Sequence, residues 1–342
     1  MADVRPGCAV ALTAPSPAIQ VAVPVLDVAS YTSHRLHGPD RVWTETNCSV
    51  DVWIELLHLL GMEPAAAAAF ALSSDFEGDA WTFLKFPPED LRALFGIEVA
   101  EMIVWKALAD HIAEHLDAGR LLTVEVDAFH LPDTHGVSYR LEHTKTTIVP
   151  LKLDRASRLL GYLHGSGYFE LRADDFDGVL RLGRHEDATV LAPYVEHIKL
   201  DGLKGASDDL ASRAEGLARQ HLTRRPSTNP VTRFRQRLDA DLPWLTQQDI
   251  ATFHKYAFAT CRQCGAAAEL AASFVEWLAS AQGSAADPAA QHLLATAEAA
   301  KSLQFSLARV ARGRTVDLRG PLERMETGWQ AAVDLLVDRH EG

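Results

Sequence analysis

The hydrophobic pattern of the chain changes near residue 205, and this change constrains the fold more than any other feature. Residues 20–200 mix helical and strand periodicity, whereas the residues from about 205 onward are almost wholly helical in pattern. A chain of 342 residues has room for about two domains of ordinary size. We therefore predict an α+β domain over residues 1–204 and a helical bundle domain over residues 205–342.

The elements expected in the first domain are helices followed by a sheet, which is an α+β order. The pattern predicts helices at 49–60, 88–94 and about 99–116, a strand at 121–127, and a hairpin of strands at about 138–153 and 158–171. In the second domain it predicts helices at 207–221, 246–281, 288–312 and 319–338, with a break at 226–230.

Charge and cysteine content limit the partners and the compartment. The chain carries 33 Lys+Arg against 46 Asp+Glu, a formal net charge of −13, so its overall field opposes binding to nucleic acid or to an anionic membrane. Four cysteines are too few for a disulfide framework, and we expect a cytoplasmic protein. The apolar stretch 9–29 is interrupted by prolines and is interpreted as strand and loop, and no long apolar run predicts a membrane span.

Cys48 is the first candidate for chemistry, because it immediately precedes the predicted helix at 49–60. Unsatisfied N–H groups at a helix N-terminus favour thiolate over thiol and can also hold an oxyanion. The alternative is that Cys48 is a small buried apolar residue without reactivity. Catalysis therefore requires a partner.

His143 is the best candidate base, since it falls in the strand predicted around 141–146, far downstream of Cys48. A cysteine on a helix and a histidine on a later strand form the papain-type arrangement for nucleophilic acyl transfer. The alternative is a histidine on the solvent face of the strand.

Several motifs carry a resemblance to known families. Asn47-Cys48, the segment 119–127, Leu131-Pro132 and His143 with its following strand resemble the papain-fold acyltransferases related to the N-terminal domain of butirosin biosynthesis protein H. More broadly, they resemble bacteriocin-processing cysteine peptidases. Segments 161–171, 253–263 and 301–309 resemble a bacterial family encoded beside amino acid:carrier-protein ligases, over about residues 24–335.

The resemblance implies a papain-like fold and a cysteine acyltransferase of secondary metabolism. Cys48 would take an aminoacyl group from the phosphopantetheine thioester of an acidic carrier protein and pass it to a small amine acceptor, with His143 as general base. No bound cofactor is implied, because the partner carries the phosphopantetheine. The alternatives are a thiol hydrolase acting as thioesterase or amidase, and a non-catalytic scaffold that binds the carrier protein.

The resemblance leaves two roles open. The peptidases have a glutamine oxyanion donor six residues before the cysteine, where this chain has Val42, so the side chains of Thr44, Thr46 and Asn47 are the candidate donors. The third catalytic residue has no direct match. Asp127, at a strand end, and His164 are the candidates.

Polar residues in the helical half fall on shared helix faces. They are His254, Arg262 and Glu269 on one helix, and Lys301 and Gln304 on the next. Charges inside an apolar bundle need partners. We expect either ion pairs of Glu269 with Arg262 or Lys301, or a pocket that closes over Cys48 and binds the acyl group.

Six arginines lie between residues 217 and 238 without one acidic residue. Arg224, Arg225, Arg233 and Arg235 are the candidate docking residues for the acidic carrier protein. The alternative is a solvated linker whose arginines pair with Asp239 and Asp241. Cys261 and Cys264 form a C-x-x-C within a helix, without a second cysteine pair, so no metal site is expected.

Overall fold

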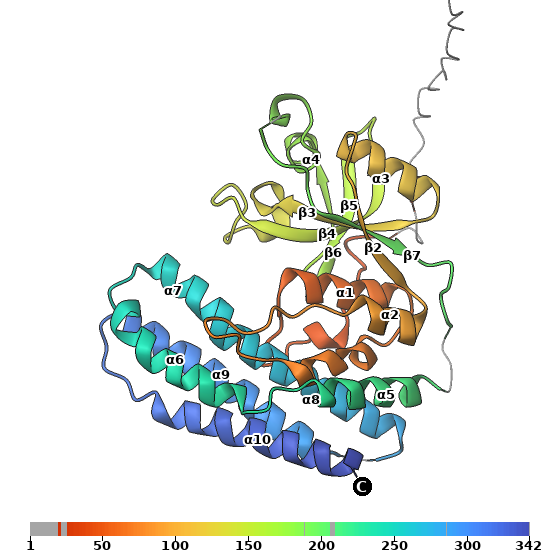
Figure 1. Ribbon diagram of the computed structural model, residues 1–342. Coiled ribbons are helices and arrows are strands. Elements are labelled where there is room, and N and C mark those ends of the chain that lie inside the picture. Colours follow the sequence, from red (N-terminus) through yellow and green to blue (C-terminus); the bar gives the residue numbers. More distant parts are fainter. Residues whose placement is uncertain (1–19, 22–25, 188, 206–208, 285, 342) are drawn as a thin grey trace, which may run out of the picture.

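The computed structural model describes residues 20–21, 26–187, 189–205, 209–284 and 286–341 (Figure 1). Most of the apolar N-terminal stretch, for which we expect strand and loop, lies outside these residues. None of the helices in the described ranges combines the length and apolar character that crossing a bilayer requires.

One antiparallel sheet forms the core of the N-terminal half. Its strand order is β2-β7-β3-β4-β5-β6, and a two-residue strand β1 pairs with β4. The strands are β1 Gln20–Val21, β2 Glu98–Met102, β3 Leu121–Asp127, β4 Lys145–Asp154, β5 Leu159–His164, β6 Gly167–Arg172 and β7 Val195–Lys199. The α+β class predicted from the sequence is confirmed.

Helices cover both faces of this sheet. Helix α1 (Cys48–Leu59) packs against β4 and β5, and α3 (Leu108–Asp117) packs against β3 and β4. In Figure 1, α1 and α2 (Pro88–Phe95) lie between the sheet and the long C-terminal helices, while α3 and α4 (Ala173–Leu180) lie on the other side.

The C-terminal half is helical, as predicted. It consists of α5 Leu210–Thr223, α6 Pro230–Leu245, α7 Ile250–Ala257, α8 Gln263–Ala281, α9 Pro288–Ala311 and α10 Arg319–Glu341. A π-helical turn, Phe258–Arg262, joins α7 to α8 within the helix predicted at 246–281. Helix α6 was not predicted, because its arginine-rich sequence after two prolines has the composition of a linker.

Three expectations for the sheet region are wrong. His143 is not on a strand, because β4 begins only at Lys145. The helix expected at 99–116 is strand β2 followed by α3. The strand expected at 158–171 is two strands, β5 and β6, which reverse at Gly165, whose φ of +51° favours glycine.

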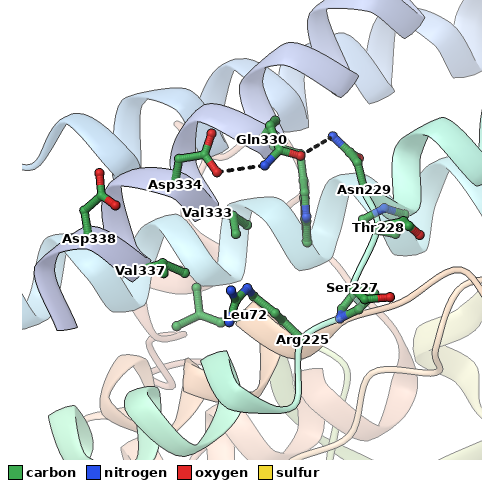
Figure 2. Close-up of a pocket in the computed structure, with 13 residues that line it drawn as sticks. Leu72, Arg225, Ser227, Thr228, Asn229, Gln330, Val333, Asp334, Val337 and Asp338 are labelled. Atoms are coloured by element: carbon green, nitrogen blue, oxygen red, sulfur yellow. Dashed lines mark hydrogen bonds between the residues drawn. The ribbon is translucent and has the colours of Figure 1, made fainter. Parts of the chain in front are cut away.

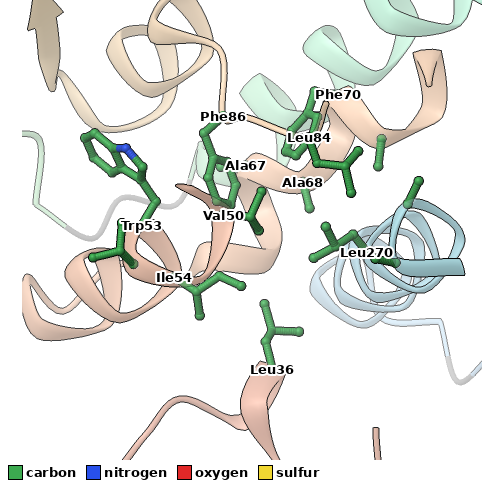
Figure 3. Close-up of a cluster of buried hydrophobic side chains, with 14 of the residues drawn as sticks. Leu36, Val50, Trp53, Ile54, Ala67, Ala68, Phe70, Leu84, Phe86 and Leu270 are labelled. Atoms are coloured by element: carbon green, nitrogen blue, oxygen red, sulfur yellow. The ribbon is translucent and has the colours of Figure 1, made fainter. Parts of the chain in front are cut away.

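The two halves share one continuous hydrophobic core. A 3₁₀ helix, η2 (Pro64–Ser73), contains the alanine run 65–69, and all five of these alanines are buried. Their small side chains let α5 and α8 approach this helix closely. Figure 3 shows Leu270 of α8 facing Val50 and Ile54 of α1.

Candidate functional site

Cys48 is the first residue of α1, and the residue before it, Asn47, caps the helix. Asn47 Oδ1 accepts hydrogen bonds from the backbone N–H groups of Ser49 and Val50, both at 3.0 Å. Asn47 Nδ2 donates to Leu84 O at 2.9 Å, and Thr46 Oγ1 donates to Asp51 Oδ1 at 2.6 Å. The side-chain donors of Thr46 and Asn47 therefore already have acceptors within the chain, which does not favour the predicted oxyanion role.

A small cavity of about 60 Å³ lies beside Cys48. The strands β3 and β4 supply four of its polar side chains, because alternate residues of a strand share one face. Its lining residues are Cys48, Ser49, Trp53, Phe83, Lys85, Thr123, Glu125, Lys145, Thr147, Tyr194 and Glu196. A partly exposed thiol thus faces a polar, charged wall.

Two ion pairs dominate this wall. Lys85 Nζ lies 2.7 Å from Glu196 Oε1, and Lys145 Nζ lies 2.6 Å from Glu125 Oε1. The residue beside the sulfur is Thr147, whose Oγ1 is 3.8 Å from Cys48 Sγ. These residues were not predicted, although the polar alternation of Thr123 and Glu125 on β3 is a readable signal.

His143 lies in the loop before β4 and pairs with Asp127. Its Nδ1 is 2.5 Å from Asp127 Oδ2, and its ring stacks on Phe129 with centroids 4.4 Å apart. The side chain is 72% exposed and does not line the cavity of Cys48. The structure thus brings together the predicted base and the predicted acid but does not place either beside the thiol.

His164 belongs to a separate buried network. Its Nδ1 is 2.5 Å from Asp133 Oδ2, and its Nε2 is 2.7 Å from Thr146 Oγ1. Thr146 precedes Thr147 on β4, so its side chain points to the opposite face of the sheet from Cys48. The prediction that His164 joins Cys48 at one site is wrong for this reason.

Both halves of the chain match known domain families. Residues 32–200 match the DUF1839 N-terminal domain, and residues 207–338 match the DUF1839 C-terminal domain. The chain belongs to the DUF1839 family. The boundary between its two DUF1839 domains, at residues 201–206, falls where the hydrophobic pattern changes. No curated protein matches the sequence.

The charged residues of the DUF1839 C-terminal domain hold the segment that leads into Cys48. Arg262 Nε donates to Thr46 O at 2.9 Å. Glu269 accepts from the backbone N–H groups of Val42 at 2.8 Å and Trp43 at 2.7 Å. Lys301 Nζ lies 4.0 Å from the centroid of a Trp43 ring. These residues therefore fix the path of residues 41–46.

This arrangement corrects the two expectations for these residues. Glu269 pairs with Arg41, at 3.5 Å, rather than with Arg262 or Lys301, and none of the three lines the cavity of Cys48. His254 is exposed on α7, and within the described residues Gln304 Oε1 is buried without a hydrogen-bond partner. A substrate-binding role for this group is therefore not supported by the geometry.

Most of the clustered arginines of the DUF1839 C-terminal domain have internal partners. Arg233 binds Asp75 and the carbonyl of Phe76, and Arg235 Nη1 lies 3.2 Å from Glu326 Oε2. The sequence left two interpretations open, docking of a carrier protein or pairing with Asp239 and Asp241. Arg237 does pair with Asp241, at 2.7 Å, but the carboxylates bound by Arg233 and Arg235 are distant in sequence. Since their charges are neutralised within the chain, Arg233 and Arg235 do not form a free basic surface. Arg224 is exposed at the end of α5.

A buried charged network lies on α1 of the DUF1839 N-terminal domain. His37 binds Glu55 through Nδ1, and its Nε2 is 3.5 Å from Asp51 Oδ1. Tyr31 OH donates to Glu55 at 2.6 Å. Burial disfavours the charged form of His37, but the hydrogen bonds to Asp51 and Glu55 outweigh burial and raise the pKa of His37 to about 9.

We expect this network to make folding stability depend on pH. In the folded protein the pKa of His37 is about 9, above the value of roughly 6.5 in an unfolded chain. Protonated His37 therefore stabilises the fold fully below about pH 6.5, and this stabilisation is lost as the pH rises through about 9. Urea unfolding should show wild type losing on the order of 3 kcal/mol between pH 6.5 and 9.5. His37→Gln should be less stable at pH 6.5 and should lack this loss. If the free energy of unfolding fell by the same amount in both proteins over this pH range, His37 would not be the group responsible.

Proposed function

We propose that the chain is a cysteine-dependent acyltransferase with a papain-like arrangement. In this proposal, Cys48 takes an acyl or aminoacyl group from a carrier-protein phosphopantetheine thioester and passes it to an amine. The observation that carries it is the thiol at the first turn of α1, facing a cavity that two lysines and two glutamates line. A helix on one face of an antiparallel sheet, with the cysteine at its start, also suits a papain-like site.

The reaction would proceed in two exchanges. The sulfur of Cys48 attacks the thioester carbonyl, the bond to the phosphopantetheine sulfur breaks, and the thiol proton passes to that leaving sulfur. An amine then attacks the acyl-Cys48 carbonyl, forms an amide, and releases Cys48 as a thiol again. The backbone N–H of Cys48 has no partner within the helix, and Lys85 and Lys145, although each is paired with a glutamate, offer ammonium donors to an oxyanion in the cavity.

His143 is our proposed proton carrier. Asp127 follows Glu125 by two positions on β3, so it lies on the face of the cavity, about 7 Å further along the strand. His143 is mostly exposed, its Nδ1 pairs with Asp127, and its ring stacks on Phe129. In this proposal the loop that carries His143 moves toward Cys48 when the substrate binds.

Intact-protein mass spectrometry with an aminoacyl-loaded carrier protein tests the proposal. The wild type should gain the mass of the aminoacyl group, and Cys48→Ala should gain nothing. Adding amines should discharge the adduct as an amide, whereas an adduct that decays equally without amine indicates the hydrolase alternative. Carrier binding without any adduct indicates the scaffold alternative and would overturn the proposal.

The role of His143 has its own test. His143→Ala should slow acylation of Cys48 by roughly 100-fold, within the usual range for loss of a general base. Glu125→Gln removes a carboxylate that already lines the cavity and should change the rate by only a few fold. The measurement is the rate of adduct formation by rapid quench. The reverse order of effects would reassign the proton acceptor to Glu125.

A further inference from the structure

A cavity of about 420 Å³ lies between α10 and the connector 224–229 that joins α5 to α6 (Figure 2). This volume is within the usual range for small-molecule sites. Leu72, Val333 and Val337 supply an apolar part of the wall, together with the buried Trp329. The cavity shares no lining residue with the cavity of Cys48.

The positive group of this cavity is Arg225. Its neighbours Arg233, Arg235 and Arg237 each form an ion pair, but Arg225 forms none with the residues that the structure describes. Arg225 Nη1 donates to Leu222 O at 2.7 Å, which holds the guanidinium in place and leaves its other N–H groups for a ligand.

The negative groups come from α10 on the opposite side. Asp334 accepts a hydrogen bond from Gln330 Nε2 at 2.8 Å and retains further acceptor capacity. The Asp338 side chain is exposed and forms no ion pair with those residues whose side chains the structure describes. Both carboxylates line the same cavity as Arg225 without pairing with it (Figure 2).

We propose that this cavity binds a free α-amino acid with an apolar side chain. A guanidinium binds a carboxylate through two parallel hydrogen bonds, which assigns the ligand carboxylate to Arg225. Asp334 and Asp338 receive the ammonium group, and the side chain packs on Leu72, Val333 and Val337. A ligand that is only an anion is repelled by the two aspartates, and a ligand that is only a cation is repelled by Arg225. A zwitterion satisfies both, and this site does not depend on acyl transfer at Cys48.

Isothermal titration calorimetry on the full chain tests the site. Leucine, methionine and phenylalanine are the probes, with isoamylamine as the analogue without a carboxylate and 4-methylpentanoic acid as the analogue without an ammonium group. At least one amino acid should bind, and both leucine analogues should bind at least about tenfold more weakly than leucine. Arg225→Gln should weaken amino acid binding by a similar factor.

Arg224→Gln is the matched control, because Arg224 is adjacent and exposed and does not line the cavity. The affinity of Arg224→Gln for the amino acid should equal that of wild type. Asp338→Asn, an exposed position on α10, should also weaken binding and serves as the second variant if Arg225→Gln does not fold. Three results overturn the proposal: no binding of any probe amino acid at about 10 mM, equal affinities of the two arginine variants, or equal affinities of leucine and isoamylamine.

Discussion

Replacing Cys48 by alanine should lower acyl transfer on the order of 10⁴-fold, because no acyl-enzyme thioester can form without the sulfur. The fold should be unaffected, since Cys48 is only partly buried at the first turn of α1, where Asn47 provides the cap. The rate is measured as amide product formed from an aminoacyl-loaded carrier protein and an amine.

The other described cysteines offer a matched control. Cys261 and Cys264 are fully buried, and burial raises the pKa of Cys261 to about 12 and that of Cys264 well above its usual value. Cys264→Ala should therefore leave the transfer rate unchanged. Retention of more than about a tenth of wild-type activity by Cys48→Ala would exclude a thioester on this residue.

Replacing Glu269 by alanine should destabilise the protein by about 3 to 5 kcal/mol, which is the usual cost of removing one partner from a buried ion pair. The change leaves the N–H groups of Val42 and Trp43 without their acceptor, and the half-buried Arg41 loses its carboxylate. Free energies of unfolding from urea titration measure the loss.

Glu276→Ala is the control for this effect. Glu276 lies on the same helix α8 but is exposed, so its removal should change the free energy of unfolding by less than about 0.5 kcal/mol. Glu269→Gln, which keeps an acceptor but loses the charge, should be intermediate. Similar free energies for Glu269→Ala and Glu276→Ala would show that Glu269 does not anchor residues 41–46.

The sequence was a good guide to regular, locally encoded elements. Helix α1 begins within one residue of its predicted start, because Asn47 is a strong N-cap ahead of an amphipathic pattern. The region 99–116 was misread because strand β2 is a short edge strand with no alternating apolar face. Strand β6 was merged with β5 because one glycine-containing turn interrupts a continuous apolar run.

The candidate site was harder to predict, because its partners are distant in the chain. Sequence reasoning singled out Cys48, and it also named Asp127 and His143, which form a pair. It did not identify Lys85 or Glu196, which meet across more than a hundred residues. For Glu269 and Arg262 it offered either an ion pair or a pocket, because composition and periodicity do not reveal their backbone partners at residues 42–46.

The buried alanines of η2 have a consequence for how this protein can be divided. Helix α8 of the C-terminal DUF1839 domain packs directly on them. Each domain alone would therefore expose to water the apolar residues that this contact buries. We therefore expect the two domains to unfold together, although each matches its own family model. The boundary at 201–206 marks a change of pattern along the chain and is a poor place to cut it for expression or for domain exchange.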